Sequence, residues 1–540
     1  MDSRARALID RLGRMKSERS LWESHWTEIA RVMSPFRDDF LSQRTAGEKR
    51  MEHILDGTPG VAGENLSSAL WGMMTNSANA WFTLKAEDEA LNEDHAVKLW
   101  LDDAGRRLYG AFASGGQRFY TRVVDLFSDL VHFGTSVFYV DEIVGKRELH
   151  FSCRHLAECF IAENQLEQVD TVFRCYRWSA RQAVQQWGDR VSAKVREAAE
   201  KRPEDRFEFL HAVLPAKDYD GKSSGLPVAS VYLCVDDGHI IDESGYYELP
   251  YQVPRWSQRS RSVYGDSPAM LALADAKMLQ RMSAATITAA EKAVDPPLLT
   301  SDENVGKGIR IKRGKLIPGS LDAEGRPKYQ PLQSGGQIGL GLEIEEQRRN
   351  AVREAFFASL LMLVNQPGRT ATEVLALQEE KMRLMGPHLG RVQSEFLDPL
   401  IGRVFNILLR AGGLPPPPPV MLEAGANLMV EYVSPAARQQ RAGEAMAIVR
   451  TLEVVAPMAS VDPSIMDNFD GDEVAQIAGN SFGLPAKALR SPEAVAQIRQ
   501  QRAQQQALAA AAEAAPKVAG AMKQGAEAQQ IAQGQQGRAA

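Results

Sequence analysis

The chain has 540 residues, of which 44% are hydrophobic and 24% are charged, and its formal net charge at pH 7 is −6. This length exceeds what one hydrophobic core supports, so several domains are expected. The negative balance argues against a protein that coats nucleic acid, because such a surface would be basic. The first residues lack the apolar segment of a signal peptide, and no apolar run approaches the roughly 18 residues of a membrane span, so neither is expected.

The N-terminal region is predicted to begin with two helices. Apolar residues at helical spacing predict an amphipathic helix over residues 1–34, which ends at Pro35 because proline cannot continue a helix. Its apolar face consists of Leu8, Leu12, Met15, Trp22, Trp26, Ile29 and Met33. Thr58 is expected to cap the next helix, with Pro59 at its first position. Further helices are predicted over residues 97–112 and 118–131.

A β-rich region follows. Apolar runs rich in strand-forming residues predict strands over residues 136–141, 148–153, 169–178, 207–214, 228–235 and 239–242. Asp236-Asp237-Gly238 is a hairpin turn before the last of these strands. Ser179 is expected to cap a helix that ends at Trp187-Gly188. Residues 1–265 therefore form a mixed α+β body.

Residues 264–413 are predicted to hold two long helices joined by a small β insert. Asp266 or Ser267 caps the first helix, Pro268 fits its first turn, and 27 residues to Val294 give a rod roughly 40 Å long. The second helix is predicted from about residue 340 to 361. Its expected inward stripe is Leu340, Ile344, Ala351, Phe356 and Leu360.

Two such rods bury little surface in one copy, so we expect them to pack beside the rods of other copies. Small residues of the first rod would permit that close approach: Ala272, Ala274, Ala284, Ala285, Ala289 and Ala290.

A loop at residues 362–370 leads into a third long helix. Thr370-Ala371-Thr372-Glu373 has the spacing of a capping box, Pro387 and Pro399 are expected to kink the helix, and Gly412-Gly413 ends it. Beyond a stiff run of five prolines, the pattern predicts a strand over residues 428–433, helices over 435–455, 475–482 and 492–515, and a flexible tail over 516–540.

Several motifs occur together in an order that resembles a known family. They are Trp22 to Pro35, Asp56-Gly57-Thr58-Pro59-Gly60, Tyr264-Gly265-Asp266-Ser267-Pro268, Arg369-Thr370-Ala371-Thr372-Glu373-Val374, Leu384-Met385-Gly386-Pro387 and Glu395-Phe396-Leu397-Asp398-Pro399-Leu400. Together they resemble the portal, or head-to-tail connector, of short-tailed bacteriophages (podovirus type). The likeness extends from Trp22 to about Leu409 and thins out beyond.

The resemblance implies a mainly helical α+β portal fold, with wing, stem helices, clip and a crown with a C-terminal helical barrel, assembled as a ring. The expected domains are a wing or body at 1–265, the first stem helix at 266–295, the clip at 296–336, the second stem helix at 337–361, the channel or tunnel loop at 362–370, the kinked wing helix and start of the crown at 371–433, the helical crown or barrel at 434–515 and the tail at 516–540.

The function implied is a channel at one capsid vertex, through which a terminase motor packages double-stranded DNA and through which the DNA is later ejected. Expected partners are other copies in a ring of twelve, the terminase large subunit, tail adaptor or head completion proteins, and capsid and scaffolding proteins, with no membrane and no cofactor. The protein would be found in the virion at the portal vertex, and in the host cytoplasm during assembly.

Cations near the predicted channel are the candidate DNA contacts. The resemblance places the loop holding Asn365, Gln366 and Arg369 in the channel, and Arg369 is the first choice for a phosphate contact. Arg348, Arg349 and Arg353 are weaker candidates. Pairing with Glu345, Glu346 or Glu354 within the helix explains those three arginines equally well.

The insert between the two rods is basic in a chain that is acidic overall. Ile309 to Leu316 alternates apolar and cationic residues, which predicts a strand and turn. A solvated hairpin is one interpretation. The other, supported by the resemblance, is a docking surface for terminase and tail adaptor, formed by Lys307, Arg310, Lys312, Arg313 and Lys315.

Other functions leave weaker traces. Gly221-Lys222-Ser223 resembles the end of a phosphate-binding loop, but Ala216 stands where that loop needs glycine. The four cysteines, Cys153, Cys159, Cys175 and Cys234, form no CxxC pair and are typical of reduced thiols.

Two alternatives to a portal remain. One is an internal virion core or scaffold protein without a channel, which the Ala/Gln-rich C-terminus favours. The other is a nucleotide-hydrolysing enzyme, which the Gly221-Lys222-Ser223 motif suggests.

Overall fold

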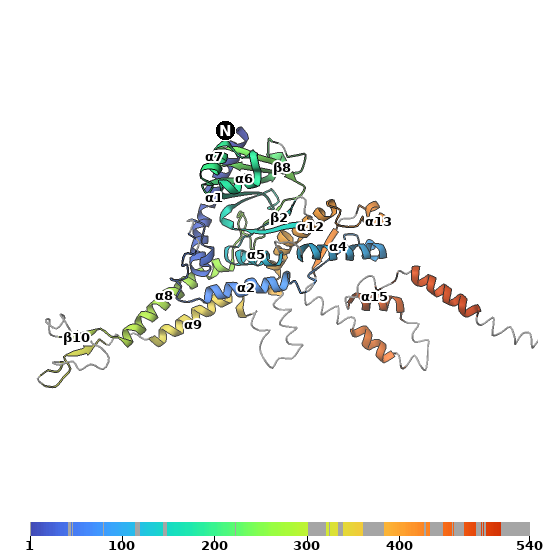
Figure 1. Ribbon diagram of the computed structural model, residues 1–540. Helices are drawn as coiled ribbons and strands as arrows, with labels where there is room; N and C mark the ends of the chain where they lie inside the picture. The colour runs from blue at the N-terminus through green and yellow to red at the C-terminus, as the bar shows by residue number, and fades with distance from the viewer. Residues whose placement is uncertain are drawn as a thin grey trace, which may run out of the picture. The chain divides into compact units, whose positions relative to one another are not determined.

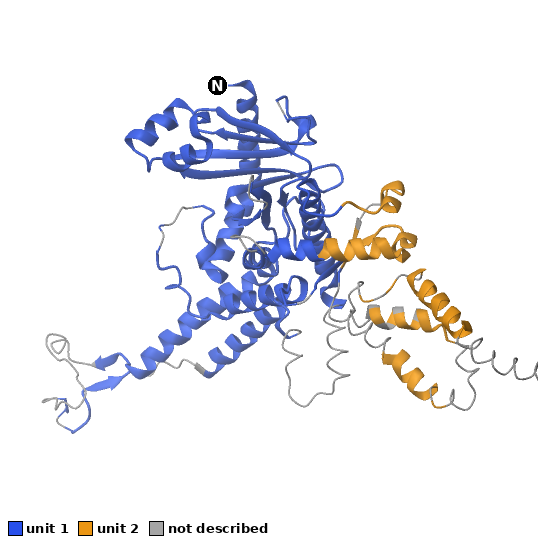
Figure 2. Cartoon of the chain, turned by 45° about the vertical axis from the view of Figure 1, so that its right-hand side comes forward, with its two compact units in different colours: residues 1–83, 106–415, 432–436 blue, residues 84–105, 416–431, 437–540 orange. Residues whose placement is uncertain are grey.

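A computed structural model describes residues 2–41, 45, 47–78, 80–113, 119–143, 148–221, 223–300, 320–322, 324–332, 338–359, 383–425, 428–432, 446–455, 457, 469–481, 488, 490 and 493–508. The chain divides into two compact units (Figure 2): unit 1 is residues 1–83, 106–415 and 432–436, and unit 2 is residues 84–105, 416–431 and 437–540. Helices predominate and the described strands form small sheets, so the predicted α+β, mainly helical class is confirmed. The predicted domain boundaries stay a prediction.

Three helices form the helical part of the body of unit 1: α1 (Ser3–Met33), α2 (Thr58–Met74) and α5 (Phe119–Phe133). A short 3₁₀ turn, η1 (Pro35–Arg37), follows α1, as Pro35 predicts. The predicted cap of α2 was wrong by one residue, because Thr58 is already helical and Gly57 is the N-cap. Asp56 Oδ1 accepts the Thr58 N–H at 2.8 Å, so a side chain two residues upstream satisfies this free donor.

A five-stranded antiparallel sheet carries helices on both faces. Its strands, in spatial order, are β4 (Cys159–Glu163), β5 (Val169–Ser179), β6 (Arg206–Pro215), β7 (Val228–Cys234) and β8 (His239–Tyr246). Leu8 and Leu12 of α1 pack on the face that holds Leu210. Helices α6 (Ala180–Trp187) and α7 (Ala193–Lys201) cover the face that holds Phe209, as the alternation of side chains along β6 requires. Ser179 caps α6 in a capping box with Gln182, as predicted.

A second, three-stranded sheet lies against α5. Its order is β3-β2-β9, with bounds Glu148–Arg154, Val137–Ile143 and Tyr251–Gln252. Phe119 of α5 contacts Phe151 and Phe138 with ring centroids 5.5 Å and 6.0 Å apart. From the very short β9 the chain leads through residues 253–267 into α8 (Pro268–Val294).

The predicted helix pair is present in unit 1, and its two members lie side by side (Figure 1). Helix α8 (Pro268–Val294) ends at Asp295-Pro296, and β10 (Leu298–Thr300) pairs antiparallel with β11 (Tyr329–Pro331) before α9 (Ile338–Ala355) returns. The second rod was predicted to reach residue 361, but α9 ends at Ala355. There Phe357 adopts a φ of 56°, which a bulky residue rarely does and a helix cannot include.

The predicted inward stripe of the second rod holds only in part. Phe356 is buried as expected, and Val352 is buried beside it, but Leu340 is 53% exposed. The distal end of the pair extends beyond the body, so helical spacing alone could not show which turns would be covered. The predicted cationic strand at 309–316 and the stripe residue Leu360 lie outside the described residues.

The third long helix of unit 1 contains a wider turn. Regular helical residues 383–392 lead into a π-helical turn, η6 (Gln393–Leu397), and then into α12 (Asp398–Arg410). The Asp398 N–H bonds the Gln393 carbonyl, and Pro399, which has no N–H, follows directly. The irregularity thus lies beside Pro399, where a kink was predicted.

Unit 2 consists of short helices and one strand. Its described elements are α3 (Glu89–Glu93), the first part of α4 (His95–Ala113), α13 (Pro419–Glu423), β12 (Leu428–Tyr432), α15 (Gly471–Ser481) and helical residues 446–455 and 493–508. Strand β12 pairs with β1 (Phe82–Ala86), and within the unit Lys85 Nζ lies 3.2 Å from Glu431 Oε2. The predicted strand at 428–433 and helix at 475–482 agree with β12 and α15.

Candidate functional site at the base of the helix pair

Residues 253–267, between β9 and α8, form the segment from which the helix pair starts. Ser267 caps α8: its Oγ accepts the Met270 N–H at 3.0 Å and donates to the His132 carbonyl of α5 at 2.8 Å. Pro268 occupies the first turn, as predicted. One serine therefore both starts α8 and ties it to α5.

The same segment crosses the end of α5 at two glycines. Gly134 has a φ of +74°, and a Cβ built on it would lie 2.2 Å from the Gly265 carbonyl oxygen. A Cβ on Gly265 would lie 2.4 Å from the Gly134 carbonyl oxygen. The Gly265 N–H also donates to Thr135 Oγ1 at 2.8 Å. Only glycine permits this approach of two backbones.

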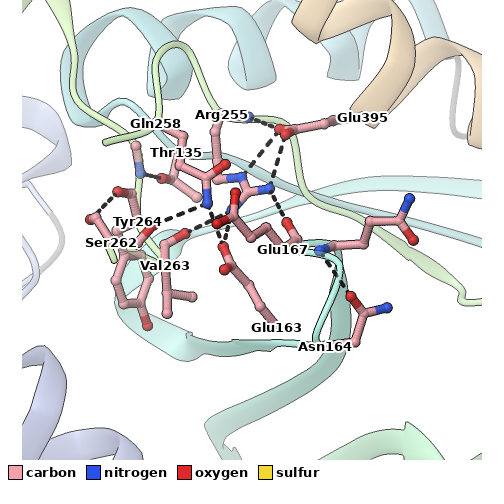
Figure 3. Close-up of polar contacts among 12 residues, drawn as sticks. Thr135, Glu163, Asn164, Glu167, Arg255, Gln258, Ser262, Val263, Tyr264 and Glu395 are labelled. Atoms are coloured by element: carbon pink, nitrogen blue, oxygen red, sulfur yellow. Dashed lines mark hydrogen bonds and ion pairs between the residues drawn. The ribbon is translucent and has the colours of Figure 1, made fainter. Parts of the chain in front are cut away.

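Arg255 is the buried centre of the segment (Figure 3), with a side chain that is 2% exposed. Its Nη2 donates to Glu395 Oε1 at 2.9 Å and to the Glu167 carbonyl at 2.9 Å, and its backbone N–H donates to Glu395 Oε2 at 2.8 Å. Its Nη1 donates to Glu163. Burial raises the pKa of Glu163, and the charge of Arg255 offsets only part of that rise. One guanidinium thus joins β4, the α8 base and η6.

Trp256, the next residue, contacts two neighbouring helical segments. Its ring stacks on His388 with centroids 4.4 Å apart, and His388 Nδ1 lies 3.1 Å from the Trp256 carbonyl oxygen. Phe357, just past α9, lies 6.3 Å from the same indole. Residues just past α9 and the helical residues 383–392 therefore meet on the base of α8.

Arginines of α9 hold the helix pair together and onto the body. Arg348 Nη1 donates to Asp275 of α8 at 2.7 Å. Arg349 Nε donates to Asp56 at 2.8 Å, and Gln280 of α8 donates to the Asp56 carbonyl at 2.6 Å. Lys277 of α8 pairs with Glu28 of α1 at 3.0 Å. The proximal half of the pair is thus attached at several independent points.

A cavity of about 640 Å³ lies beside the Arg255 cluster. Arg391 and Arg403 line it, and both are paired: Arg391 with Glu395 at 2.9 Å, and Arg403 with Glu248 at 3.5 Å and Asp141 at 3.4 Å. Within the described residues no group of three His, Cys, Asp or Glu side chains is placed to hold a metal ion. The charged side chains at this cavity therefore form ion pairs that link secondary-structure elements.

Comparison with known proteins identifies the family. A family model described as bacteriophage head to tail connecting protein matches residues 5–489. The chain belongs to this family. This connector is 31% identical over 516 residues to the "Probable portal protein" of Bordetella phage BPP-1, covering 92% of this chain and 91% of that protein. It is 30% identical over 518 residues to the "Portal protein" of Salmonella phage epsilon15, with the same two coverages. The resemblance found from the sequence motifs is confirmed.

Solved structures give a weaker likeness. A chain of the "Virion of native gene transfer agent (GTA) particle" has a TM-score of 0.36 at 12% identity, covering 81% of this chain and 94% of that one. A chain of the "Neck of native GTA particle computed with C12 symmetry" has a TM-score of 0.34 at 14% identity, covering 74% and 87%. Scores this low support no conclusion about the connector.

Most of the site residues proposed from the sequence lie outside the described residues. These are Asn365, Gln366 and Arg369 of the channel loop, and Lys307, Arg310, Lys312, Arg313 and Lys315 of the clip. The other three candidates lie on α9 and are paired. Arg349 lies 2.9 Å from Glu345 and 3.2 Å from Glu346, and Arg353 lies 2.8 Å from Glu346, which is the intrahelical pairing considered as the alternative. Arg348 pairs with α8 instead.

The residues that sequence reasoning missed are the buried ion pairs. Arg255 and Glu395 are 140 residues apart, and Arg255 and Glu163 are 92 apart. A local signal existed at Arg255 alone, since an arginine between Pro254 and Trp256 beside buried strand residues is unusual. Nothing in the sequence around Glu163 or Glu395 indicated that they would be its partners.

Among the described helices of the chain, none combines the length and apolarity needed to cross a bilayer.

The Asp56–Arg349 contact predicts a pH effect. Burial raises the pKa of Asp56, but the hydrogen bonds from Thr58 and Arg349 outweigh it, so the net pKa is lowered. The stabilisation by ionised Asp56 is therefore present above its unfolded-state pKa of about 3.9 and is lost as pH falls through its lower folded-state pKa.

Asp56→Asn keeps an acceptor for Thr58 and removes the charge. We expect it to lower the free energy of unfolding by about 1–3 kcal/mol at pH 7. Denaturant unfolding from pH 7 to pH 3 checks this, and an unchanged difference between the two proteins at pH 3 would contradict it.

Proposed function

We propose that this chain is the subunit of a portal: a ring at one capsid vertex through which double-stranded DNA is packaged by a terminase motor and later ejected. The observation that carries the proposal is membership of the head to tail connecting family over residues 5–489, together with near full-length similarity to two phage portal proteins. The protein is a structural channel and not an enzyme. It is a virion component at the portal vertex, and it assembles in the host cytoplasm.

The helix pair is the proposed wall of the channel. Its proximal half is fixed by Asp56, Asp275 and Glu28, while its distal half carries exposed apolar residues. Ile287 of α8 is 45% exposed and Leu340 of α9 53% in the single copy, and Leu298 of the adjoining β10 is 42% exposed. Exposed apolar side chains of this kind suit contact with another protein. In a ring of twelve, each pair would be flanked by the pairs of its neighbours.

We expect the channel wall to bind DNA only weakly, because its positive charges are paired with carboxylates. The α9 arginines are neutralised by glutamates and aspartates, and the chain as a whole is acidic. A strongly cationic lining would hold DNA through counterion release, whereas a neutral or mildly acidic lining lets it slide. Arg369, with Asn365 and Gln366, is the proposed point of phosphate contact in the channel loop. The clip cations Lys307, Arg310, Lys312, Arg313 and Lys315 are the proposed docking site for terminase and then for tail adaptor or head completion proteins, while capsid and scaffolding proteins surround the ring.

Imaging tests the function most directly. We expect negative-stain micrographs of the purified chain to show rings with a central hole, of one size, with end-on views having twelve units. Purified protein without nucleotide or DNA is sufficient, since the contact is between copies. A chain that stays monomeric at the highest attainable concentration, or that forms solid particles without a hole, would contradict a portal.

A further inference from the structure

The two flanks of the helix pair carry opposite charges, for which the described part of the chain offers no partner. Helix α9 lies against the side of α8 that holds Asp275 and Thr286, because Arg348 bonds Asp275 at 2.7 Å and Gly341 lies close to Thr286. Arg281 is six residues beyond Asp275, which is about 240° around the helix and faces away from α9. Arg281 is exposed, and no described residue gives it a hydrogen bond or ion pair.

The free side of α9 is acidic. Glu343 is two residues beyond Gly341, about 200° around the helix, so it faces away from α8. It is exposed, and within the described residues it also has no hydrogen bond or ion pair. Glu346 and Glu354 lie on the same side, but Glu346 is already bound by Arg349 and Arg353. Glu354 is exposed as well but lies eleven residues closer to the body, so Glu343 is the carboxylate available at the distal part of this side.

The two charges lie at the same height along the pair. The helices are antiparallel, with Asp275 opposite Arg348 and Thr286 opposite Gly341. Interpolation between these contacts places Arg281 level with residues 342–346, which include Glu343. The α8 flank is open there, since the attachment of Lys277 to Glu28 of α1 lies one turn closer to the body.

Apolar residues extend the α8 flank. Met278 is 45% exposed and lies three residues before Arg281, so the two side chains are neighbours on the helix surface. Leu271, seven residues before Met278 and on the same side, is 75% exposed. The flank thus combines a cation with apolar surface, which is the composition of a protein contact.

We propose that Arg281 of one copy pairs with Glu343 of the next copy around the ring, with Met278 packed beside that contact and Leu271 on the same flank about 15 Å along the helix. With the helix pair running along the ring axis, rotation about that axis keeps every atom at its own height, so opposite flanks that match in height and differ in charge meet when copies are repeated head to tail. The occupant of the α8 flank is a second copy of this chain. The inference rests on the proposed ring and names the contact that closes its stem.

Charge reversal is the first test. Arg281→Glu and Glu343→Arg are each expected to raise the protein concentration at half assembly by about two- to fivefold at low salt, as measured by sedimentation. The double variant Arg281→Glu/Glu343→Arg should return it close to the wild-type value. Lys217→Glu, an equal charge change on an exposed 3₁₀ turn of the body, is the control and should have no effect.

Cross-linking is the second test and does not depend on a change in affinity. The full chain carrying Arg281→Cys and Glu343→Cys should give, with a short bismaleimide cross-linker, a ladder of covalent multimers up to the full ring. A linker is used because an Arg–Glu pair can hold its Cα atoms farther apart than the roughly 7 Å that a disulfide spans. Each single variant alone should give none, and a mixture of the two single variants should give dimers.

The outcomes separate this inference from the proposed function. Rings that form normally, ignore both reversals and yield no cross-link would overturn the Arg281–Glu343 contact while leaving the portal intact. Wild-type protein that forms no ring would overturn both. Rescue by the double reversal, together with the ladder, would establish the contact.

Discussion

Arg255→Ala is expected to lower the free energy of unfolding by about 3–5 kcal/mol, because it removes a buried guanidinium that pairs with two partly buried carboxylates, of which only Glu395 keeps a second cation, Arg391. Glu163 and Glu395 lose their common partner, and the Glu167 carbonyl loses a donor. Denaturant or thermal unfolding, followed by tryptophan fluorescence, measures the loss. Trp256, one of the eight tryptophans of the chain, adjoins the site.

Arg259→Ala is the matched control. Arg259 lies four residues along the same segment and pairs with Asp266, but its side chain is 73% exposed. An exposed pair of this kind contributes at most about 1 kcal/mol. Equal losses in the two variants would show that the Arg255 cluster is no more important than a surface ion pair.

Gly134→Ala is expected to be nearly as damaging, at about 2–5 kcal/mol. The left-handed φ of +74° costs an alanine about 1–2 kcal/mol, and the methyl group at 2.2 Å from the Gly265 carbonyl forces the two backbones apart at a further 1–3 kcal/mol. Because this crossing positions Ser267, the cap of α8, we expect the variant also to yield fewer rings in micrographs.

Gly412→Ala is the control that separates the conformational cost of Gly134→Ala from its steric cost. Gly412 has a φ of +66°, but a Cβ there would meet nothing within 4 Å. Its substitution should cost only the conformational part, about 1–2 kcal/mol, and leave assembly unchanged. If Gly134→Ala were no worse than Gly412→Ala, the close crossing would have no energetic importance.

The helices could be predicted because their signals are local. In α1, the apolar residues from Leu8 to Met33 recur at helical spacing, and all of that face is buried except the half-buried Trp22. The same spacing has a position at Arg19, which is buried and bonds the Leu156 and Cys159 carbonyls at 2.8 Å and 2.5 Å. The position of Arg19 within the apolar stripe indicates that its side chain is buried, but the sequence pattern does not show which carbonyl groups it bonds.

The strands show the limit of the same reasoning. Strands β5, β6 and β7 are long, apolar runs and were predicted almost to their ends. Strand β4 was missed because it has five residues and follows a 3₁₀ turn directly. Strand β9, with two residues, has no periodicity at all, and it exists only because β2 pairs with it.

The candidate site divides in the same way. The cap at Ser267 and the first-turn Pro268 could be predicted, since both signals lie within three residues. The role of Ala272 could not: it was expected at a contact between copies, but it is 1% exposed within a single copy. Helical spacing shows that one side is small and apolar, whereas tertiary packing decides what covers it.

The π-helical turn at Gln393–Leu397 has a consequence for α12. Such a turn contains one residue more than regular helix, and converting it would rotate everything after it by about 100° about the helix axis. Glu395 lies inside that turn and is held by Arg255 through two oxygens. Expelling the extra residue would shift Glu395 relative to Arg255 and disrupt this ion pair. The salt bridge therefore helps to fix the rotational phase of α12, together with the bonds of Arg403 to Asp141 and Glu248.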